Sequence, residues 1–158
     1  MQTVALLEAG WRDPGEVLAA FAEVHTQRPV RRLLSIGAGS ALPETYLAAL
    51  HPELEVVLTD LDPQQVARTR RRADRMRLSN ITTTPLDLLA PGPAWRDDPG
   101  YDLVVGIEVL EHIDDDATAA ATIASLSRRY VYQLVPRATP AELADPVARR
   151  RACRNHHH

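Results

Sequence analysis

The 158-residue chain contains a single cysteine, Cys153, and no lysine at all. One cysteine allows neither an internal disulfide nor a metal site built from several cysteines. Without lysine there is no amine for a Schiff base and no lysine general base, which excludes aldolase-like and pyridoxal-dependent mechanisms. The 18 basic residues are therefore all arginines, and with 21 acidic residues the net charge of −3 gives no overall attraction to nucleic acid.

Long apolar runs are also missing, since no stretch approaches the roughly 18 uncharged apolar residues of a membrane-spanning helix. Residues 1–15 lack the basic start and apolar run of a signal peptide, so we expect a cytoplasmic protein with no membrane partner. Apolar residues make up 45% and charged residues 25% of the chain, a balance typical of folded globular proteins. The length predicts one domain over residues 1–158. The composition, rich in alanine and arginine, is typical of a GC-rich bacterial genome.

Apolar segments alternate with segments of helical periodicity along most of the chain. Apolar and β-branched runs predict strands over residues 31–36, 54–58, 81–84, 101–107 and 130–135. Amphipathic or alanine-rich segments predict helices over residues 14–26, 43–50, 63–78 and 116–126. Because the strands are apolar almost throughout, both faces of the sheet should be buried, which predicts a doubly wound α/β fold with a mainly parallel sheet. The core is expected over residues 31–136, after an N-terminal helical segment (1–28) and before a tail (137–158).

The first core strand is followed by the turn Gly37-Ala38-Gly39-Ser40-Ala41. Doubly wound sheets bind ligands at the carboxyl ends of their strands. Glycine at 37 and 39 allows a tight turn and a close approach of the backbone to a ligand, and the next helix offers free amides to an anionic group. A strand-to-helix turn without any ligand would also use these glycines.

A second marker is Asp60, which lies 21 residues beyond Gly39 at the end of the second core strand. A carboxylate in this place accepts hydrogen bonds from both hydroxyl groups of an adenosine ribose. A dinucleotide-binding turn would need a further glycine where this chain has Leu42. The pattern therefore disfavours a dinucleotide, whereas Asp62 is expected to cap the helix that opens at Pro63.

Four segments, LLSIGAGSA, VVLTDLDP, PLDLL and YDLVVGIEVLEHI, resemble in their order and spacing the nucleotide-binding core of the class I S-adenosylmethionine-dependent methyltransferases. The resemblance covers about residues 33–136 and implies a Rossmann-like methyltransferase fold with S-adenosylmethionine as cofactor. It implies that Gly37 and Gly39 approach the methionine and ribose portions of the cofactor. The other implied contacts are Asp60 at the ribose, Leu61 and Asp87 at the adenine, Leu88 beside Asp87, and Ile107 with Glu108 facing the methionine and the acceptor.

Two residues depart from the pattern of that family. Ser35 stands where the family usually has an acidic residue that helps to orient the ammonium side of the cofactor, and Ala41 replaces a third glycine. The methyl group of Ala41 costs little if its backbone is right-handed and more if φ is positive. The family also completes its sheet with a strand pair beyond the fifth strand, which we expect to be short or missing here. A second copy of the chain or a partner subunit could then cover the open edge.

The most distinctive polar cluster is Glu108-Val109-Leu110-Glu111-His112. If a helix begins near Val109, the side chains of Glu108, Glu111 and His112 converge on one face. In the first interpretation Glu108 and His112 line the pocket of a small-molecule acceptor, and His112 takes a proton as the methyl group arrives.

In a second interpretation these three side chains bind a divalent cation such as Mg²⁺ or Mn²⁺, which prefers mixed oxygen and nitrogen ligands. The cluster then resembles the E-x-x-E-H signature of the small-RNA 3′-terminal 2′-O-methyltransferases, and His156 could supply their downstream histidine. Arginines between Arg68 and Arg77 would attract RNA phosphates, although such a run on a helix is more often a solvated face. Because similar strings occur in metal-free small-molecule methyltransferases, we expect no metal. A third interpretation is a cofactor-binding or scaffold domain without turnover.

Overall fold

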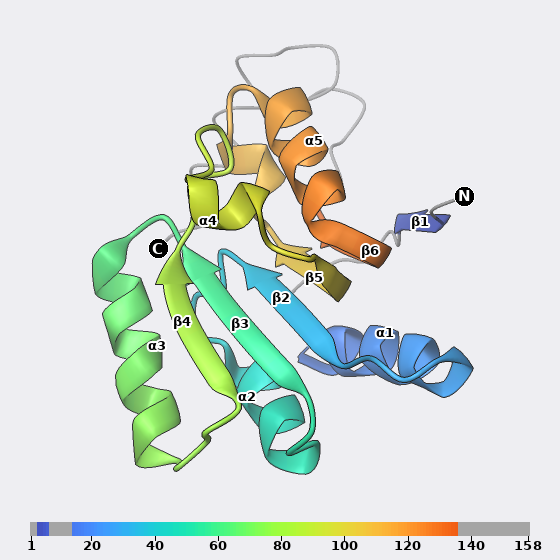
Figure 1. The fold of residues 1–158 in the computed structure, drawn as a ribbon, viewed down its shortest axis with the longest axis vertical. Coiled ribbons are helices and arrows are strands. Elements are labelled where there is room, and N and C mark those ends of the chain that lie inside the picture. Colours follow the sequence, from blue (N-terminus) through green and yellow to red (C-terminus); the bar gives the residue numbers. More distant parts are fainter. Residues whose placement is uncertain (1–2, 7–13, 136–158) are drawn as a thin grey trace, which may run out of the picture.

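The computed structural model describes residues 3–6 and 14–135, and the statements below concern this part of the chain. Six strands form one sheet in the order β1-β6-β5-β2-β3-β4, and all neighbours are parallel (Figure 1). The strands are β1 (Thr3–Leu6), β2 (Arg32–Ile36), β3 (Glu55–Asp60), β4 (Ile81–Pro85), β5 (Tyr101–Ile107) and β6 (Ser127–Leu134). The predicted doubly wound α/β fold is confirmed.

Helices cover both faces of the sheet. They are α1 (Pro14–Gln27), α2 (Leu42–Leu50), α3 (Pro63–Arg75), α4 (Pro93–Arg96) and α5 (Asp116–Leu126), with one 3₁₀ turn, η1 (Leu110–His112), after β5. Apolar side chains of α1, α2 and α3 form one core with the sheet, and those of α5 form a second core on the other face. The chain runs outward from β2 to β4 and then returns to β5 on the other side of β2. This reversal creates a switch point at the carboxyl ends of β2 and β5.

The predicted strands and helices are all present, with boundaries shifted by at most three residues. The largest shifts have local causes. Helix α3 ends at Arg75 rather than at 78, because Arg77 has a left-handed φ of 56° that a continuing helix cannot accommodate. Its start is as expected, since the Asp62 side chain accepts a hydrogen bond from the amide of Gln64 at 2.8 Å.

Strand β1 was not expected, because the N-terminal segment was predicted to be helical. Residues Thr3–Leu6 instead pair in parallel with residues 130–133 of β6. Four residues are too few to show the alternation of apolar and polar side chains that predicts a strand. Their extended conformation is accompanied by pairing with β6, which the sequence pattern does not reveal. The edge that we expected a second copy or a partner to cover is thus paired within the chain over these four residues. The tail at 137–158, with the expected short or missing strand pair, lies outside the described residues.

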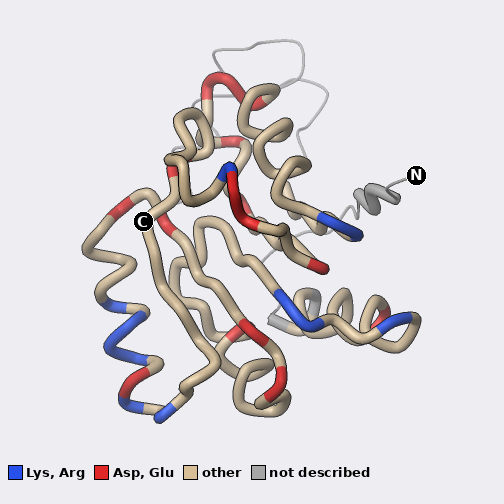
Figure 2. Tube along the Cα trace, in the orientation of Figure 1, with Lys and Arg blue, Asp and Glu red and all other residues tan. Residues whose placement is uncertain are grey.

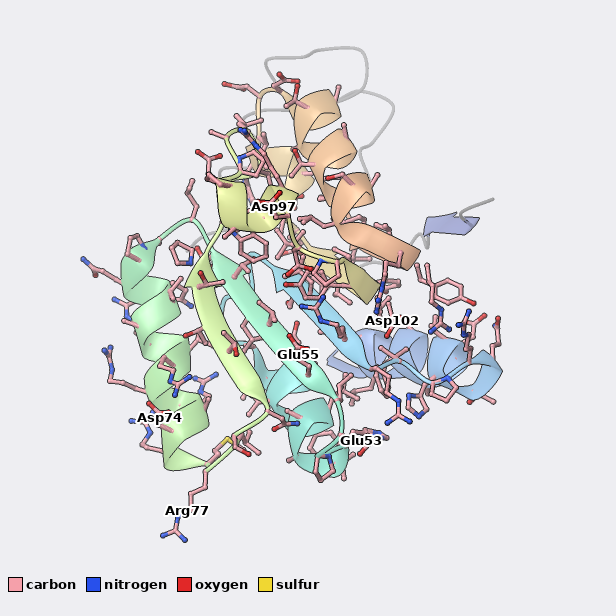
Figure 3. All side chains as sticks on the ribbon, in the orientation of Figure 1. Glu53, Glu55, Asp74, Arg77, Asp97 and Asp102 are labelled. Carbon is pink, nitrogen blue, oxygen red and sulfur yellow. The ribbon has the colours of Figure 1, made fainter. Side chains whose placement is uncertain are left out.

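At the amino end of the sheet, Asp102 of β5 joins three segments (Figure 3). Its Oδ2 accepts hydrogen bonds from the amides of Arg31 (2.8 Å) and Arg32 (3.1 Å), and its Oδ1 lies 3.1 Å from Nη2 of Arg128. Burial alone would raise the pKa of Asp102, but these amides and the cations of Arg128 and Arg129 lower it below its usual range. Asp102 therefore fastens the start of β2 to β5 and β6.

No helix among the described residues is long and apolar enough to cross a membrane.

Candidate active site

The turn between β2 and α2 has a left-handed backbone at three positions, with φ of 59° at Gly37, 51° at Gly39 and 49° at Ala41. Because φ is positive at Ala41, its methyl group carries the higher conformational cost that was expected for a left-handed backbone. At Gly37 a β-carbon would lie 2.7 Å from Cγ2 of Val109, whereas at Gly39 the nearest atom would be 3.8 Å away. Only glycine at 37 lets the turn pass this close to the segment that follows β5.

A cavity of about 360 Å³ opens at the switch point. Residues 37–43 form one wall, and Ile107, Glu108 and His112 form the opposite wall. Ser35, Glu44 and Leu134 complete the lining together with Ile36. A volume of this size is typical of sites for small molecules and cofactors.

The structure brings together at this cavity five of the residues singled out from the sequence: Gly37, Gly39, Ile107, Glu108 and His112. The other four candidates do not line it. Asp60 ends β3 beside the turn, since the Ala38 amide donates to the carbonyl of Thr59 at 2.8 Å, and its own Oδ1 accepts from the Asp62 amide at 3.0 Å.

The remaining three candidates follow the carboxyl ends of β3 and β4. Leu61 is 69% exposed. Asp87 is exposed too, and its Oδ1 accepts a hydrogen bond from the Leu89 amide at 2.9 Å. Leu88 is buried in the core under α5, so its structural role is packing.

The polar cluster after β5 does not have the geometry that helical spacing suggested. Glu108 has a left-handed φ of 52°, its amide donates to the Leu134 carbonyl at 2.8 Å, and η1 begins only at Leu110. The turn directs Glu108 and His112 to the cavity, whereas Glu111 is not part of its lining. A 3₁₀ turn therefore stands where a helix from Val109 was expected, and Glu111 lies near His112 without lining the cavity.

The carboxyl group of Glu111 is partly buried, and only one of its two oxygens lies near a polar partner. Its Oε2 is buried without a hydrogen-bond partner among the described residues, and its Oε1 lies 3.9 Å from Nε2 of His112. Burial raises the pKa of Glu111 to about 7, and the charge of Glu108 adds to this effect while a backbone hydrogen bond opposes it. In the described part of the chain, no three His, Cys, Asp or Glu side chains are grouped as metal ligands. His156, the fourth candidate ligand, lies outside that part.

Sequence analysis did not identify Glu44, which lines the cavity although only 3% of it is exposed. Its Oε1 accepts a hydrogen bond from Oγ of Ser35 at 2.6 Å. Burial raises the pKa of Glu44, and the hydrogen bonds from Ser35 and the backbone counteract this. The signal was present in the sequence, because Glu44 precedes the buried Leu47 and Ala48 by three and four residues and so shares their helix face.

A second cavity, of about 420 Å³, lies between the turn and α3. Its lining comprises Gly39, Ser40, Gln65, Thr69 and four arginines, Arg68, Arg71, Arg72 and Arg75. Figure 2 shows this basic stretch along α3. None of the four guanidinium groups forms an ion pair with a carboxylate of the described residues, although Arg72 donates to the Ser40 carbonyl. We call this set of four the arginine face.

The parallel sheet, the glycine turn and the cavity at the switch point together define a Rossmann-like ligand-binding domain. Residues 34–129 match the family described as "Methyltransferase domain". Because the match covers more than half of the chain, the protein belongs to this methyltransferase family.

Individual relatives agree with this assignment. A ribosomal RNA small subunit methyltransferase G from Chromohalobacter salexigens is 36% identical over 75 residues, which is 45% of this chain and 36% of the relative. Coclaurine N-methyltransferase, solved with N-methylheliamine and SAH, superimposes with a TM-score of 0.61 at 17% identity over 73% of this chain and 33% of its own. The methyltransferase domain of bacterial CtHen1 gives 0.59 at 21% identity over 75% of this chain and 63% of its own. The chain thus spans between one third and two thirds of the length of these relatives.

Proposed function

We propose that this protein binds S-adenosylmethionine in the cavity at the switch point and transfers its methyl group to a small-molecule acceptor. The observation that carries the proposal is the cavity of about 360 Å³ at the switch point, where the glycine turn of residues 37–43 meets Ile107, Glu108 and His112. The residues present suit this cofactor, because the cavity is large enough, its walls are partly backbone, and it has one buried carboxylate, Glu44. Asp60, at the next strand end, is available for the ribose hydroxyl groups.

When bound, the cofactor supplies an electrophilic methyl group, so the protein needs no nucleophile of its own. This agrees with a chain without lysine and with a lining that, among the described residues, contains no cysteine. The residues of the chain have to align the acceptor, which requires reacting atoms within about 3 to 3.5 Å, and to exclude water. Ile107 and Leu134 provide apolar walls, and the Glu108 backbone is fixed by the Leu134 carbonyl. His112, which lies in the lining, is the residue that we assign to accept a proton from the hydroxyl or amine of the acceptor.

Cofactor binding is tested first, by calorimetry with S-adenosylmethionine and its demethylated product. Asp60→Ala should lose about 1.5 to 3 kcal/mol of binding free energy, the usual value for hydrogen bonds to a charged group. Asp62→Ala is the matched control, because Asp62 caps α3 and its replacement should affect stability rather than affinity. Unchanged affinity in Asp60→Ala contradicts the ribose assignment, and no binding at millimolar concentration contradicts the whole proposal.

A second candidate, methylation of RNA, is favoured by the arginine face, which adjoins the turn through Gly39 and Ser40. RNA phosphates contacted by arginines make the affinity fall with salt, with a slope of about −0.7 for each phosphate on a single strand. Replacement of Arg68, Arg71 and Arg75 by Gln should flatten this slope, whereas Arg77→Gln, which lies beyond α3 and points outward (Figure 3), should not.

Transfer of a labelled methyl group to fractionated cell extract separates the candidates. Label in the low-mass pool supports the small-molecule proposal, and label in RNA supports the second candidate. Binding of the cofactor without transfer to either pool would instead indicate a cofactor-binding domain without turnover. A manganese titration and a chelator test the metal-assisted form of the RNA reaction.

A further inference from the structure

The Glu44 carboxylate is an unusual feature of the cavity wall. It is almost completely buried, and its hydrogen-bond donors are neutral: the hydroxyl of Ser35 and a backbone amide. No arginine or histidine of the described residues forms an ion pair with it. A buried carboxylate without a cation is costly, which makes a cationic ligand the natural partner of this group.

The usual structural role of a glutamate in the first turn of a helix does not explain Glu44. Such a residue often reaches back to the backbone amide at the start of its helix. Here that amide belongs to Ala41 and donates to the carbonyl of Ala38 at 2.7 Å. The Glu44 side chain instead extends to β2 and Ser35, on the lining of the cavity. Helix capping is therefore not the reason for its position.

The other charged or titratable groups of the cavity lining are Glu108 and His112, on the opposite wall. Ser35 lies at the end of β2 and Glu44 lies at the start of α2, so the turn of residues 37–41 connects them. A ligand that places an ammonium group at this end gains a charge-assisted hydrogen bond in a site shielded from water. The hydroxyl of Ser35 donates to Oε1 of Glu44 at 2.6 Å and so fixes the orientation of the carboxylate.

We infer that Glu44, oriented by Ser35, forms an ammonium-binding subsite that receives the amino group of the methionine portion of the cofactor. This inference rests on the proposed function. It also accounts for the missing acidic residue at position 35, since α2 supplies from a neighbouring element the carboxylate that β2 lacks. Glu44 is then a binding residue and Ser35 a positioning residue.

The test compares two ligands in two proteins by calorimetry. S-adenosylhomocysteine carries the ammonium group, whereas 5′-methylthioadenosine lacks the whole amino-acid end and keeps the adenosine. Glu44→Gln should weaken binding of S-adenosylhomocysteine by about 10- to 100-fold, as expected for loss of a charge-assisted hydrogen bond, and change binding of 5′-methylthioadenosine less than about threefold. Equal effects on both ligands, or no effect on the first, overturn the inference.

Two further measurements keep the test informative even if the Glu44→Gln variant does not fold. In the unaltered protein, an analogue of S-adenosylhomocysteine without its amino group should bind about as weakly as the intact compound binds to Glu44→Gln. Ser35→Asp in the Glu44→Gln background returns a carboxylate to the same subsite and should restore part of the affinity. If the unaltered protein binds neither adenosine compound, the proposed function fails. If it binds both and the amine makes no difference, only the ammonium subsite fails.

Discussion

Single residues determine how the wall of the cavity packs, and Gly37 is the clearest case. A side chain there meets two obstacles, the left-handed φ of 59° and the contact with Val109, which is stiff because it is β-branched. Gly39 shares the backbone conformation but lacks the contact. Gly39→Ala should therefore cost about 1 to 2 kcal/mol of unfolding free energy from backbone strain alone.

Gly37→Ala should cost about 1 to 3 kcal/mol more than Gly39→Ala, because its methyl group overpacks the site. Urea denaturation of both variants measures this difference. The additional change Val109→Ala should recover part of the loss in Gly37→Ala and none in Gly39→Ala. Equal losses in the two single variants would mean that the contact with Val109 is relieved without cost.

Glu111 gives a prediction about pH. Because burial raises its pKa to about 7 in the folded protein, the folded state binds a proton more tightly than the unfolded chain does. The wild-type protein should therefore lose stability as pH rises from about 4.5 to 7, the window between the unfolded and folded values. Glu111→Gln removes the titrating group and should make the protein more stable than wild type at pH 8, with little difference at pH 5.

Denaturant titrations at pH 5 and pH 8 measure this effect. Glu23→Gln, on the exposed part of α1, is the matched control and should not change the pH dependence. A Glu111→Gln protein with the wild-type pH profile would show that the Glu111 carboxyl group is hydrated after all.

At the scale of elements, Asp102 holds the start of β2 against β5 and β6. Its pKa is lowered, so it contributes stability above its unfolded pKa, and this contribution is lost as pH falls through the lower folded value. Asp102→Asn keeps the size of the side chain but loses the charge and one acceptor. We expect it to lower the unfolding free energy by about 1 to 3 kcal/mol at pH 7, the usual cost of unsatisfied buried donors.

Because acid protonates the wild-type Asp102, the difference between wild type and Asp102→Asn should shrink at low pH. Asp97→Asn provides the control, since Asp97 is exposed at the end of α4 (Figure 3). A constant difference across the acidic range would show that geometry rather than charge accounts for the effect.

Most elements could be predicted from the sequence because their pattern is local. The strands are apolar runs buried on both faces, and α3 opens with a capping aspartate and a proline. The segment after β5 could not be predicted from spacing alone. Its conformation depends on the left-handed Glu108, which a hydrogen bond to the neighbouring strand β6 fixes. A pairing that joins residues 26 positions apart leaves no periodic trace in the sequence.

Some residues of the candidate site could likewise be predicted from the sequence, whereas others could not. Gly37 and Gly39 could be recognised because glycines directly after a strand predict a tight turn, and Ile107 and His112 because they lie at or just after the end of a strand at the switch point. Glu44 was missed because its role depends on Ser35, which lies on another element. Leu88, predicted to lie near the adenine, is buried in the core under α5, and the sequence does not separate these roles because an apolar side chain near a strand end suits a ligand contact and a core position equally well.

At the scale of the whole molecule, the sheet formed by the described residues has two edges, β4 and β1. Strand β1 protects β6, whose backbone would otherwise be free to pair with another chain. Because β1 contributes only four residues, its removal should leave both cores intact while exposing the longer edge of β6. We therefore expect deletion of residues 1–13 to produce a folded protein that self-associates.

Sedimentation of the full and shortened chains over a range of concentrations measures this association. The shortened chain should form dimers or larger species at concentrations where the full chain stays in a smaller form. A peptide with the sequence of residues 1–13, added in excess, should compete for the β6 edge and reverse the association. If the shortened chain sediments like the full chain and keeps its stability, the pairing of β1 with β6 does not protect the sheet, and the edge of β6 is shielded by its own twist and its arginines at 128 and 129.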